Sequence, residues 1–189
     1  MYGRVKKCDG QIASDNEFID KCTKDYKGDR KEAAKHFVMR GWEYFYKNKP
    51  DTSMMRFNQA WLLDSLNADV YWGFANLTGM QQKFKESLPL FERAIALNPT
   101  NSKIYESASM SYGNMFGQTQ DKQYLNTAIH HLKMADQLDH GNARIYSQLA
   151  MAYSYFMQKD SSRKYLKLAD SIDPKMVDPR IRKIVSSNY

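Results

Sequence analysis

The sequence predicts an all-α fold built from repeated antiparallel helix pairs, and three observations support this. The chain has 189 residues, of which 42% are hydrophobic, 9 are Gly and 5 are Pro, and this composition argues against a disordered or linker-rich chain. A shift of 34 residues places Phe37 on Tyr71, and then Tyr71 on Tyr105. Within each repeat, apolar and small residues recur at the three- and four-residue spacing of a helix.

The repeat divides the chain into four units between two terminal elements. We expect an N-terminal arm with a capping helix at 1–33, repeats at 34–67, 68–101, 102–142 and 143–176, and a C-terminal capping helix at 177–189. The step from Phe91 to the equivalent Leu132 is 41 residues, so the third unit carries seven extra residues. We expect these to form a loop around Gly117–Gln123.

Equivalent positions in the repeats indicate how the helices pack. One column is small in every unit and allows the two helices of a pair to approach closely: Gly41, Ala75, Ser109 and Ala150. Pro99 and Pro174 follow the second helix of their units, where a helix must stop. Pro89 is tolerated only if its helix begins late enough to place it near the first turn.

Helix-end signals predict the two terminal helices. Ser14 and Glu17 form a capping-box pattern, which predicts a helix from there to about Tyr26. The dipeptide Asp178-Pro179 places a capping carboxylate before a proline and predicts a closing helix through Ser187. Such helices cover the end faces of a repeat stack.

In these columns the chain resembles the tetratricopeptide-repeat family, whose pattern runs aromatic-x-x-Leu-Gly-x-x-Tyr, then Ala-x-x-x-Phe-x-x-Ala, then Pro. The second unit shows this pattern as Tyr71, Phe74, Ala75, Ser87, Phe91, Ala94 and Pro99. The fourth shows it as Tyr146, Leu149, Ala150, Tyr153, Ser162, Leu166, Ala169 and Pro174. The resemblance covers about residues 34–176 and implies a right-handed superhelix, an α-solenoid, with a concave surface lined by the first helix of each unit.

The sequence contains no motif of an enzyme. The four histidines show no metal-ligand spacing: His36, His130, His131 and His140. There is no glycine-rich phosphate loop, no nucleophile elbow and no cysteine with a histidine partner. We therefore expect no catalytic residue, no bound metal and no cofactor.

The resemblance implies protein–protein interaction through the concave groove. We expect a lining of aromatic, methionine and amide side chains: Val38, Trp42, Phe45, Tyr46, Trp72, Asn76, Met80, Met110, Asn114, Gln148, Met151 and Tyr155. Trp and Tyr are frequent anchors of binding energy, and Met adapts to irregular partners. The predicted function is a scaffold or assembly adaptor that binds an apolar or aromatic peptide or helix. The alternative is a self-associating structural protein, whose stripe is a homodimer interface or is filled by residues 1–33.

Some members of the family hold a terminal carboxylate with a clamp of Lys, Asn and Arg. Here Val38 and Trp42 occupy the first two clamp positions, and Ser107 replaces the later Arg. Asn76 is retained, and Lys103 matches only in part. Because the clamp is incomplete, we do not expect the chain to bind chaperone tails in that way.

The net charge of +7 is concentrated near the C-terminus. Residues 143–189 contain nine Lys and Arg against four Asp and Glu. The surplus lies at Arg163, Lys164, Lys167, Lys175, Arg180, Arg182 and Lys183. We expect a solvated basic face rather than a nucleic-acid site, because no nucleic-acid motif accompanies it. Binding of nucleic acid or anionic lipid through this run is a further hypothesis.

Cys8 and Cys22 precede the repeats and match no metal or redox motif. They can form one disulfide, which requires an oxidising compartment, or remain two free thiols. No apolar run approaches the roughly 20 residues of a membrane helix, and the first ten residues lack a signal-peptide core. Similarity to exported repeat proteins predicts the periplasm or cell envelope of a bacterium, with the cytoplasm as the alternative.

Overall fold

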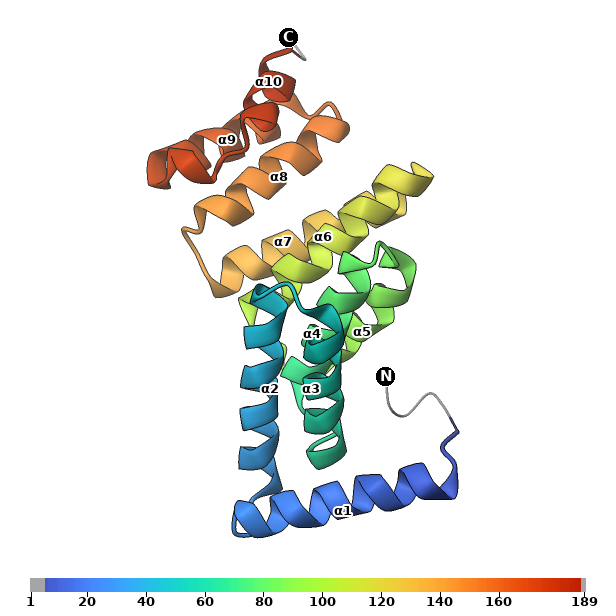
Figure 1. Ribbon diagram of the computed structural model, residues 1–189. Coiled ribbons are helices and arrows are strands. Elements are labelled where there is room, and N and C mark those ends of the chain that lie inside the picture. Colours follow the sequence, from blue (N-terminus) through green and yellow to red (C-terminus); the bar gives the residue numbers. More distant parts are fainter. Residues whose placement is uncertain (1–5, 188–189) are drawn as a thin grey trace. The chain divides into compact units, whose positions relative to one another are not determined.

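The structure, a computed structural model, describes residues 6–187 and consists of helices joined by short turns (Figure 1). The helices are α1 (Asp9–Asp25), α2 (Arg30–Tyr46), α3 (Pro50–Leu63), α4 (Ala68–Met80), α5 (Phe84–Leu97), α6 (Ser102–Thr119), α7 (Lys122–Leu138), α8 (Ala143–Tyr155), α9 (Lys159–Ile172), the 3-10 turn η1 (Pro174–Met176) and α10 (Pro179–Ser187). The predicted all-α class is confirmed. The chain divides after Pro99 into two compact units, and each is described by itself below.

Each unit contains two tightly contacting helix pairs. In the first unit α2 packs against α3, and α4 packs against α5. In the second unit the pairs are α6 with α7 and α8 with α9. Successive pairs touch through α3 and α4 in the first unit, and through α7 and α8 in the second. The short turns between consecutive helices make the members of each pair antiparallel.

Phe57 of α3 is the centre of the core of the first unit. Its ring has no exposed surface, and it lies against the backbones of α2 and α4. A Cβ atom added at Gly41 would lie 2.7 Å from Phe57 Cε1, and one added at Gly73 would lie 2.6 Å from Phe57 Cε2. Two glycines therefore create the space that one phenylalanine fills.

A buried serine connects the two helices of a pair at equivalent positions in both units. Ser53 Oγ of α3 donates a 2.8 Å hydrogen bond to the carbonyl oxygen of Gly41 on α2. Ser162 Oγ of α9 donates one of 2.8 Å to the carbonyl oxygen of Ala150 on α8. Each bond spans 12 residues and gives the buried hydroxyl a partner, which a buried polar group requires.

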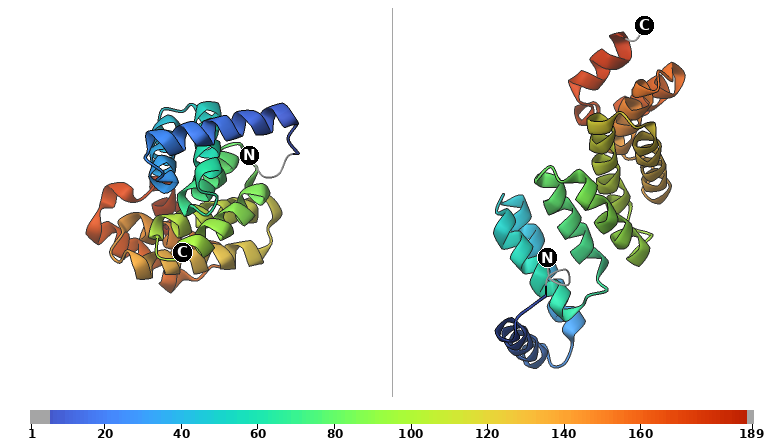
Figure 2. Two further views of the ribbon diagram at one scale, coloured as in Figure 1. Left: turned by 90° about the horizontal axis from the view of Figure 1, so that it is seen from below. Right: turned by 90° about the vertical axis from the view of Figure 1, so that its right-hand side faces the viewer.

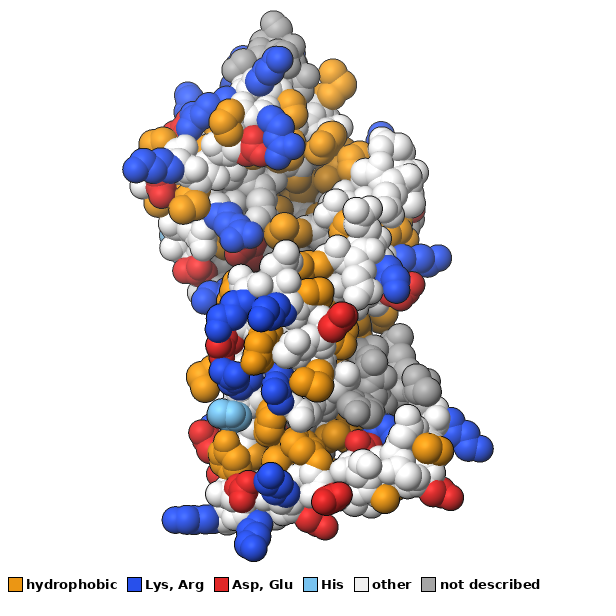
Figure 3. Space-filling view, viewed as in Figure 1, with side chains coloured by type: hydrophobic (Ala, Val, Ile, Leu, Met, Phe, Trp, Pro, Cys, Tyr) orange, Lys and Arg blue, Asp and Glu red, His pale blue; other side chains and the backbone are white. Residues whose placement is uncertain are grey.

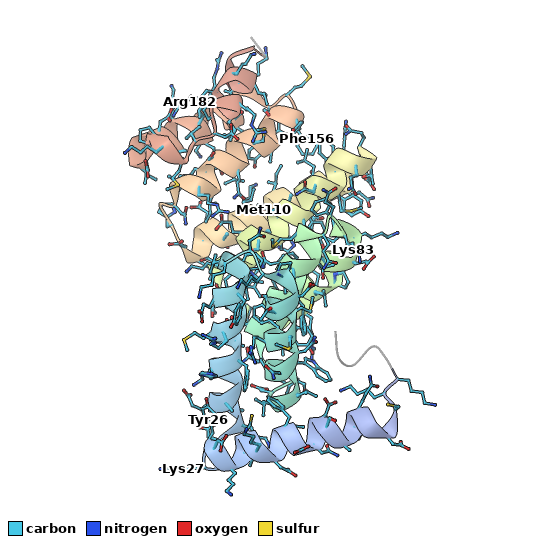
Figure 4. All side chains as sticks on the ribbon, viewed as in Figure 1. Tyr26, Lys27, Lys83, Met110, Phe156 and Arg182 are labelled. Carbon is cyan, nitrogen blue, oxygen red and sulfur yellow. The ribbon has the colours of Figure 1, made fainter. Side chains whose placement is uncertain are left out.

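Helix α1 crosses the ends of α2 and α3, as the left view of Figure 2 shows. It buries Cys22 against a small core of the first unit, which also contains Ala33, Ala34 and Leu63, with Phe18, Tyr26 and Phe37 packed around it. Figure 4 marks Tyr26 at the corner where α1 leads into α2. The arm thus provides an end cover for the first helix pair.

The predicted start of this helix at Ser14 is wrong. Helix α1 begins at Asp9, and Ser14 lies inside it, with its hydroxyl donating to the carbonyl oxygen of Gly10. The cap is Cys8, whose backbone N–H donates to Gln11 Oε1. Asp9 in the first turn also favours the earlier start, because a negative charge stabilises a helix N-terminus.

The structure favours two free thiols over the disulfide that the sequence left open. Cys8 and Cys22 are both free thiols, the first exposed and the second buried. They lie at the start and near the end of one straight helix, and 14 residues of helix span about 21 Å. A disulfide needs Cα atoms within about 7 Å, so this pair cannot form one in this fold.

The predicted loop of the third repeat is wrong, and the condition given for Pro89 is not met. The extra residues of the third repeat do not form a loop at Gly117–Gln123, because α6 continues to Thr119 and α7 begins at Lys122. They lengthen α6 to 18 residues and α7 to 17, and Asp121 caps α7 by accepting the backbone N–H of Gln123. Helix α5 begins at Phe84, so Pro89 lies in its second turn rather than its first.

The expected closing helix is present as α10. Asp178 Oδ1 accepts the backbone N–H of Arg180 at 2.8 Å, and Pro179 is the first helical residue. Ile181 and Val185 of α10 are buried, and the helix contacts α8 and α9. The capping carboxylate and the apolar face together explain why the chain forms a helix here.

Candidate functional site

Four of the predicted groove residues form one aromatic cluster on the first unit. Trp42, Phe45 and Tyr46 lie on one face of α2, and Trp72 lies on the neighbouring α4. The ring centroids of Trp42 and Trp72 are 4.4 Å apart, and those of Trp42 and Phe45 are 5.3 Å apart. Trp42 is also stacked on Tyr46 at 6.2 Å. We call these four residues the aromatic cluster.

The cluster lies between the core and solvent. The Trp42 ring contacts the buried Phe57 ring at 5.3 Å, so the inner side of the cluster is supported. Tyr46 is 78% exposed, whereas Trp42, Phe45 and Trp72 are partly exposed. The outermost ring therefore presents a large amphipathic surface on a rigid base.

The other predicted residues of the first unit differ in their surroundings. Val38 is only 8% exposed and belongs to the core, so it offers little binding surface. Asn76 lies on α4 one turn beyond Trp72, and its Nδ2 donates to the Trp72 carbonyl oxygen at 2.8 Å. Met80 is exposed at the end of α4.

In the second unit the predicted Gln148 is part of a polar network rather than free for a peptide. Its Nε2 donates to Glu106 Oε1 at 3.1 Å, and its Oε1 accepts from Ser109 Oγ at 3.2 Å. Arg144 Nε lies 2.7 Å from Glu106 Oε1. The sequence reasoning did not include Arg144, since nothing local connects it with a carboxylate 38 residues away.

The apolar residues of the second unit are more scattered. Met110, marked on α6 in Figure 4, is exposed, and its sulfur lies 3.9 Å from an Arg144 nitrogen. Tyr155 is 56% exposed and contacts the Phe116 ring at 5.4 Å. Asn114 is exposed and donates to the Met110 carbonyl, and Met151 is half-buried. Tyr155 is the one aromatic side chain among the predicted groove residues of this unit, so these residues form no counterpart of the aromatic cluster.

Asp69 is a residue of the first unit that sequence reasoning missed. It lies in the first turn of α4, three residues before Trp72 and seven before Asn76, so all three share one helical face. Its side chain is half-buried, and burial raises the pKa of its carboxyl group. The spacing of three residues between Asp69 and Trp72 is the sequence signal that could have identified Asp69.

No family model matches the sequence, and no curated protein matches it.

Solved structures resemble the chain over most of its length. TTC0263, a thermophilic TPR protein of Thermus thermophilus, matches with a TM-score of 0.67 and 19% identity over 82% of this chain and 81% of its own. YrrB, a TPR protein with an unusual peptide-binding site, matches with a TM-score of 0.63 and 19% identity over 94% and 88%. The first TPR of Spaghetti (RPAP3), bound to the HSP90 peptide SRMEEVD, matches with a TM-score of 0.59 and 18% identity over 67% and 95%.

This chain has the tetratricopeptide-repeat fold. The fold explains why the aromatic cluster is made by α2 and α4, since these are the first helices of successive pairs. In a tetratricopeptide-repeat structure the first helices line one surface, and the second helices cover them from behind.

The predicted basic surplus lies on α9, η1 and α10, and Figure 3 shows Lys and Arg side chains gathered over this part of the second unit. Two of these cations pair with nearby carboxylates. Arg180 lies 2.5 Å from Asp178, and Arg182 lies 2.5 Å from Asp170. Part of the surplus is thus neutralised within the unit.

Two negative findings concern metals and membranes. Among the residues that the structure describes, no group of three His, Cys, Asp or Glu side chains is placed to hold a metal ion. Within the same part of the chain, no helix is both long and apolar enough to cross a membrane.

Proposed function

We propose that this tetratricopeptide-repeat chain is a non-enzymatic interaction module that binds an apolar or aromatic peptide or helix through the aromatic cluster. The observation that carries the proposal is the exposed Tyr46 stacked on a Trp42 that is itself held by Trp72 and Phe57. A rigid aromatic surface loses little conformational entropy on binding, and Trp and Tyr dominate binding hot spots. The peptide-binding site of YrrB and the HSP90 peptide bound by RPAP3 support a peptide as the ligand.

The clamp positions support an apolar ligand rather than a terminal carboxylate. Val38 is buried and uncharged, and the next clamp position is the aromatic Trp42. In the second unit, the Arg144 guanidinium pairs with the Glu106 carboxylate, so it does not offer an unpaired cation to a partner's carboxylate. A partner's apolar side chains would instead stack on the cluster.

We also infer the division into four repeats, 34–67, 68–101, 102–142 and 143–176. The last three boundaries fall between helices, which supports them. The first would cut α2, because α2 begins at Arg30.

For location, we propose the periplasm or cell envelope of a bacterium. The cytoplasm, which keeps thiols reduced, is the alternative that two free cysteines fit.

The test is a selection from a random peptide library displayed on phage, followed by affinity measurement of the enriched peptides. Tyr46→Ala removes the most exposed ring of the cluster and leaves the core intact. Loss of a hot-spot side chain costs about 2 kcal/mol, so we expect affinity to fall roughly 30-fold. Leu66→Ala is the matched control, because Leu66 is 64% exposed in the same unit, in the turn between α3 and α4.

The control should bind the enriched peptides within twofold of the wild-type protein. Both substitutions are on the surface, so the unfolding free energy of both variants should stay within about 0.5 kcal/mol of wild type. Enriched peptides that bind Tyr46→Ala as tightly as wild type would contradict the proposal. So would a selection in which the wild-type chain enriches no peptide.

A further inference from the structure

Asp69 is a half-buried carboxylate beside the aromatic cluster, and the structure gives it no cation. Among residues 6–187, the structure shows no hydrogen bond and no ion pair of its side chain. It is not the helix cap either, because Asn67 Oδ1 takes that role by accepting the Asp69 backbone N–H at 3.0 Å. The carboxylate therefore has no hydrogen-bonding role within the described fold.

Two other charged residues near the start of the first helices have partners. Lys35, near the start of α2, pairs with Glu32 at 3.0 Å. Glu106, near the start of α6, pairs with Arg144 at 2.7 Å. Asp69 differs from these because it has lost water without gaining an opposite charge, and burial raises the pKa of its carboxyl group for that reason.

The neighbouring rings add a second attraction for a cation. Trp72 lies one helical turn from Asp69 on the same face of α4, and its ring contacts that of Trp42 at 4.4 Å. The face of a Trp ring is the strongest aromatic site for an ammonium or guanidinium group, particularly where water is excluded. A cation placed here would meet a poorly solvated carboxylate and a Trp ring together.

We propose that Asp69 and the aromatic cluster select a partner segment in which a Lys or Arg adjoins apolar or aromatic side chains. This inference rests on the proposed function, because it specifies the ligand of the same surface. The occupant is a peptide or helix with a basic residue in its apolar face. A partner that ends in acidic residues is disfavoured here by the charge of Asp69.

The test compares library selections on the wild-type protein and on Asp69→Asn, which keeps the shape of the side chain and removes its charge. The wild-type protein should enrich peptides that carry Lys or Arg next to aromatic residues. Asp69→Asn should still enrich aromatic peptides but lose the preference for a basic residue. Circular dichroism on both proteins shows whether they share the same helical fold.

A matched peptide pair makes the test quantitative. One enriched peptide is synthesised with Arg and again with citrulline, which has nearly the same shape but no charge. We expect the Arg peptide to bind the wild-type protein at least tenfold more tightly than the citrulline peptide. With Asp69→Asn the difference should fall to twofold or less.

The outcomes separate this inference from the proposed function. Aromatic peptides that bind through Tyr46 with no preference for Arg over citrulline would overturn the role of Asp69 and leave the proposed function standing. A preference for Arg that persists in Asp69→Asn would also overturn it. Peptides whose binding is unchanged by Tyr46→Ala would overturn both.

Discussion

Gly73→Ala is the substitution whose effect the packing of the first unit defines most sharply. Gly73 lies in the middle of α4 and faces the ring of Phe57. The added methyl would lie 2.5 Å from Phe57 Cε1 and 2.6 Å from Cε2, closer than Cβ atoms approach other side chains. Because Phe57 is fully buried, its ring cannot turn into solvent to make room.

Two effects of opposite sign determine the size of the change. Overpacking a core by one methyl costs about 1–3 kcal/mol. Alanine in place of glycine inside a helix gains about 0.5–1 kcal/mol. The difference spans about 0–2.5 kcal/mol, so we expect Gly73→Ala to lower the unfolding free energy by about 1 kcal/mol.

Gly113→Ala is the matched control. Gly113 also lies inside a long helix, α6, and among the described residues no atom outside its own stretch of helix would lie within 4 Å of its added Cβ. At Gly113 only the higher helix propensity of alanine applies, so we expect the unfolding free energy to rise by about 0.5–1 kcal/mol. Urea unfolding followed by circular dichroism and Trp fluorescence measures both changes. Fluorescence reports on the first unit, since Trp42 contacts the Phe57 ring at 5.3 Å.

The double variant Gly73→Ala with Phe57→Leu tests the cause. The smaller side chain makes room for the new methyl, so the two substitutions together should cost less than the sum of each alone. The reasoning is refuted if Gly73→Ala is as stabilising as Gly113→Ala. It is also refuted if the costs of the two substitutions simply add.

Two further predictions follow from the hydrogen bonds of the core and of α10. Ser53→Ala removes a buried donor to α2 and should lower the unfolding free energy by about 0.5–1.5 kcal/mol in urea, whereas no change would show that the bond contributes nothing. Hydrogen bonds from Arg180 hold the pKa of Asp178 below its ordinary value, so its stabilisation of α10 is fully present above about pH 4 and is lost as the pH falls through the lowered pKa. The protection factors of the α10 amides, which correct for the intrinsic pH dependence of exchange, should fall in that range, and protection factors that do not change with the protonation of Asp178 would contradict the assignment.

The periodic pattern of the sequence was sufficient to predict the helix pairs. Small residues such as Gly41 and large ones such as Phe57 recur at fixed spacing because every pair repeats the same contact. The cap at Asp178 could also be predicted, since capping depends on residues two or three apart. Aromatic residues one step off the packing columns also pointed to the face on which Trp42 and Trp72 meet.

Helix boundaries at which two local signals compete could not be predicted as well. Ser14 and Glu17 form a valid capping pattern, yet α1 begins at Asp9, because residues 8–11 offer a cap of their own. The extra residues of the third repeat extend α6 and α7, and the cap at Asp121 begins α7 two residues after α6 ends.

The candidate site shows most clearly what the sequence alone determined and what the tertiary structure decided. The sequence determined which residues face away from the helix pairs, because that follows from a period of 3.6 residues. Only the tertiary structure decided that Val38 is buried, that Gln148 and Arg144 are both bound to Glu106, and that Asp69 has no cation among the described residues. Burial and ion pairing arise between helices that are distant in the sequence, and no local pattern encodes which charges will meet.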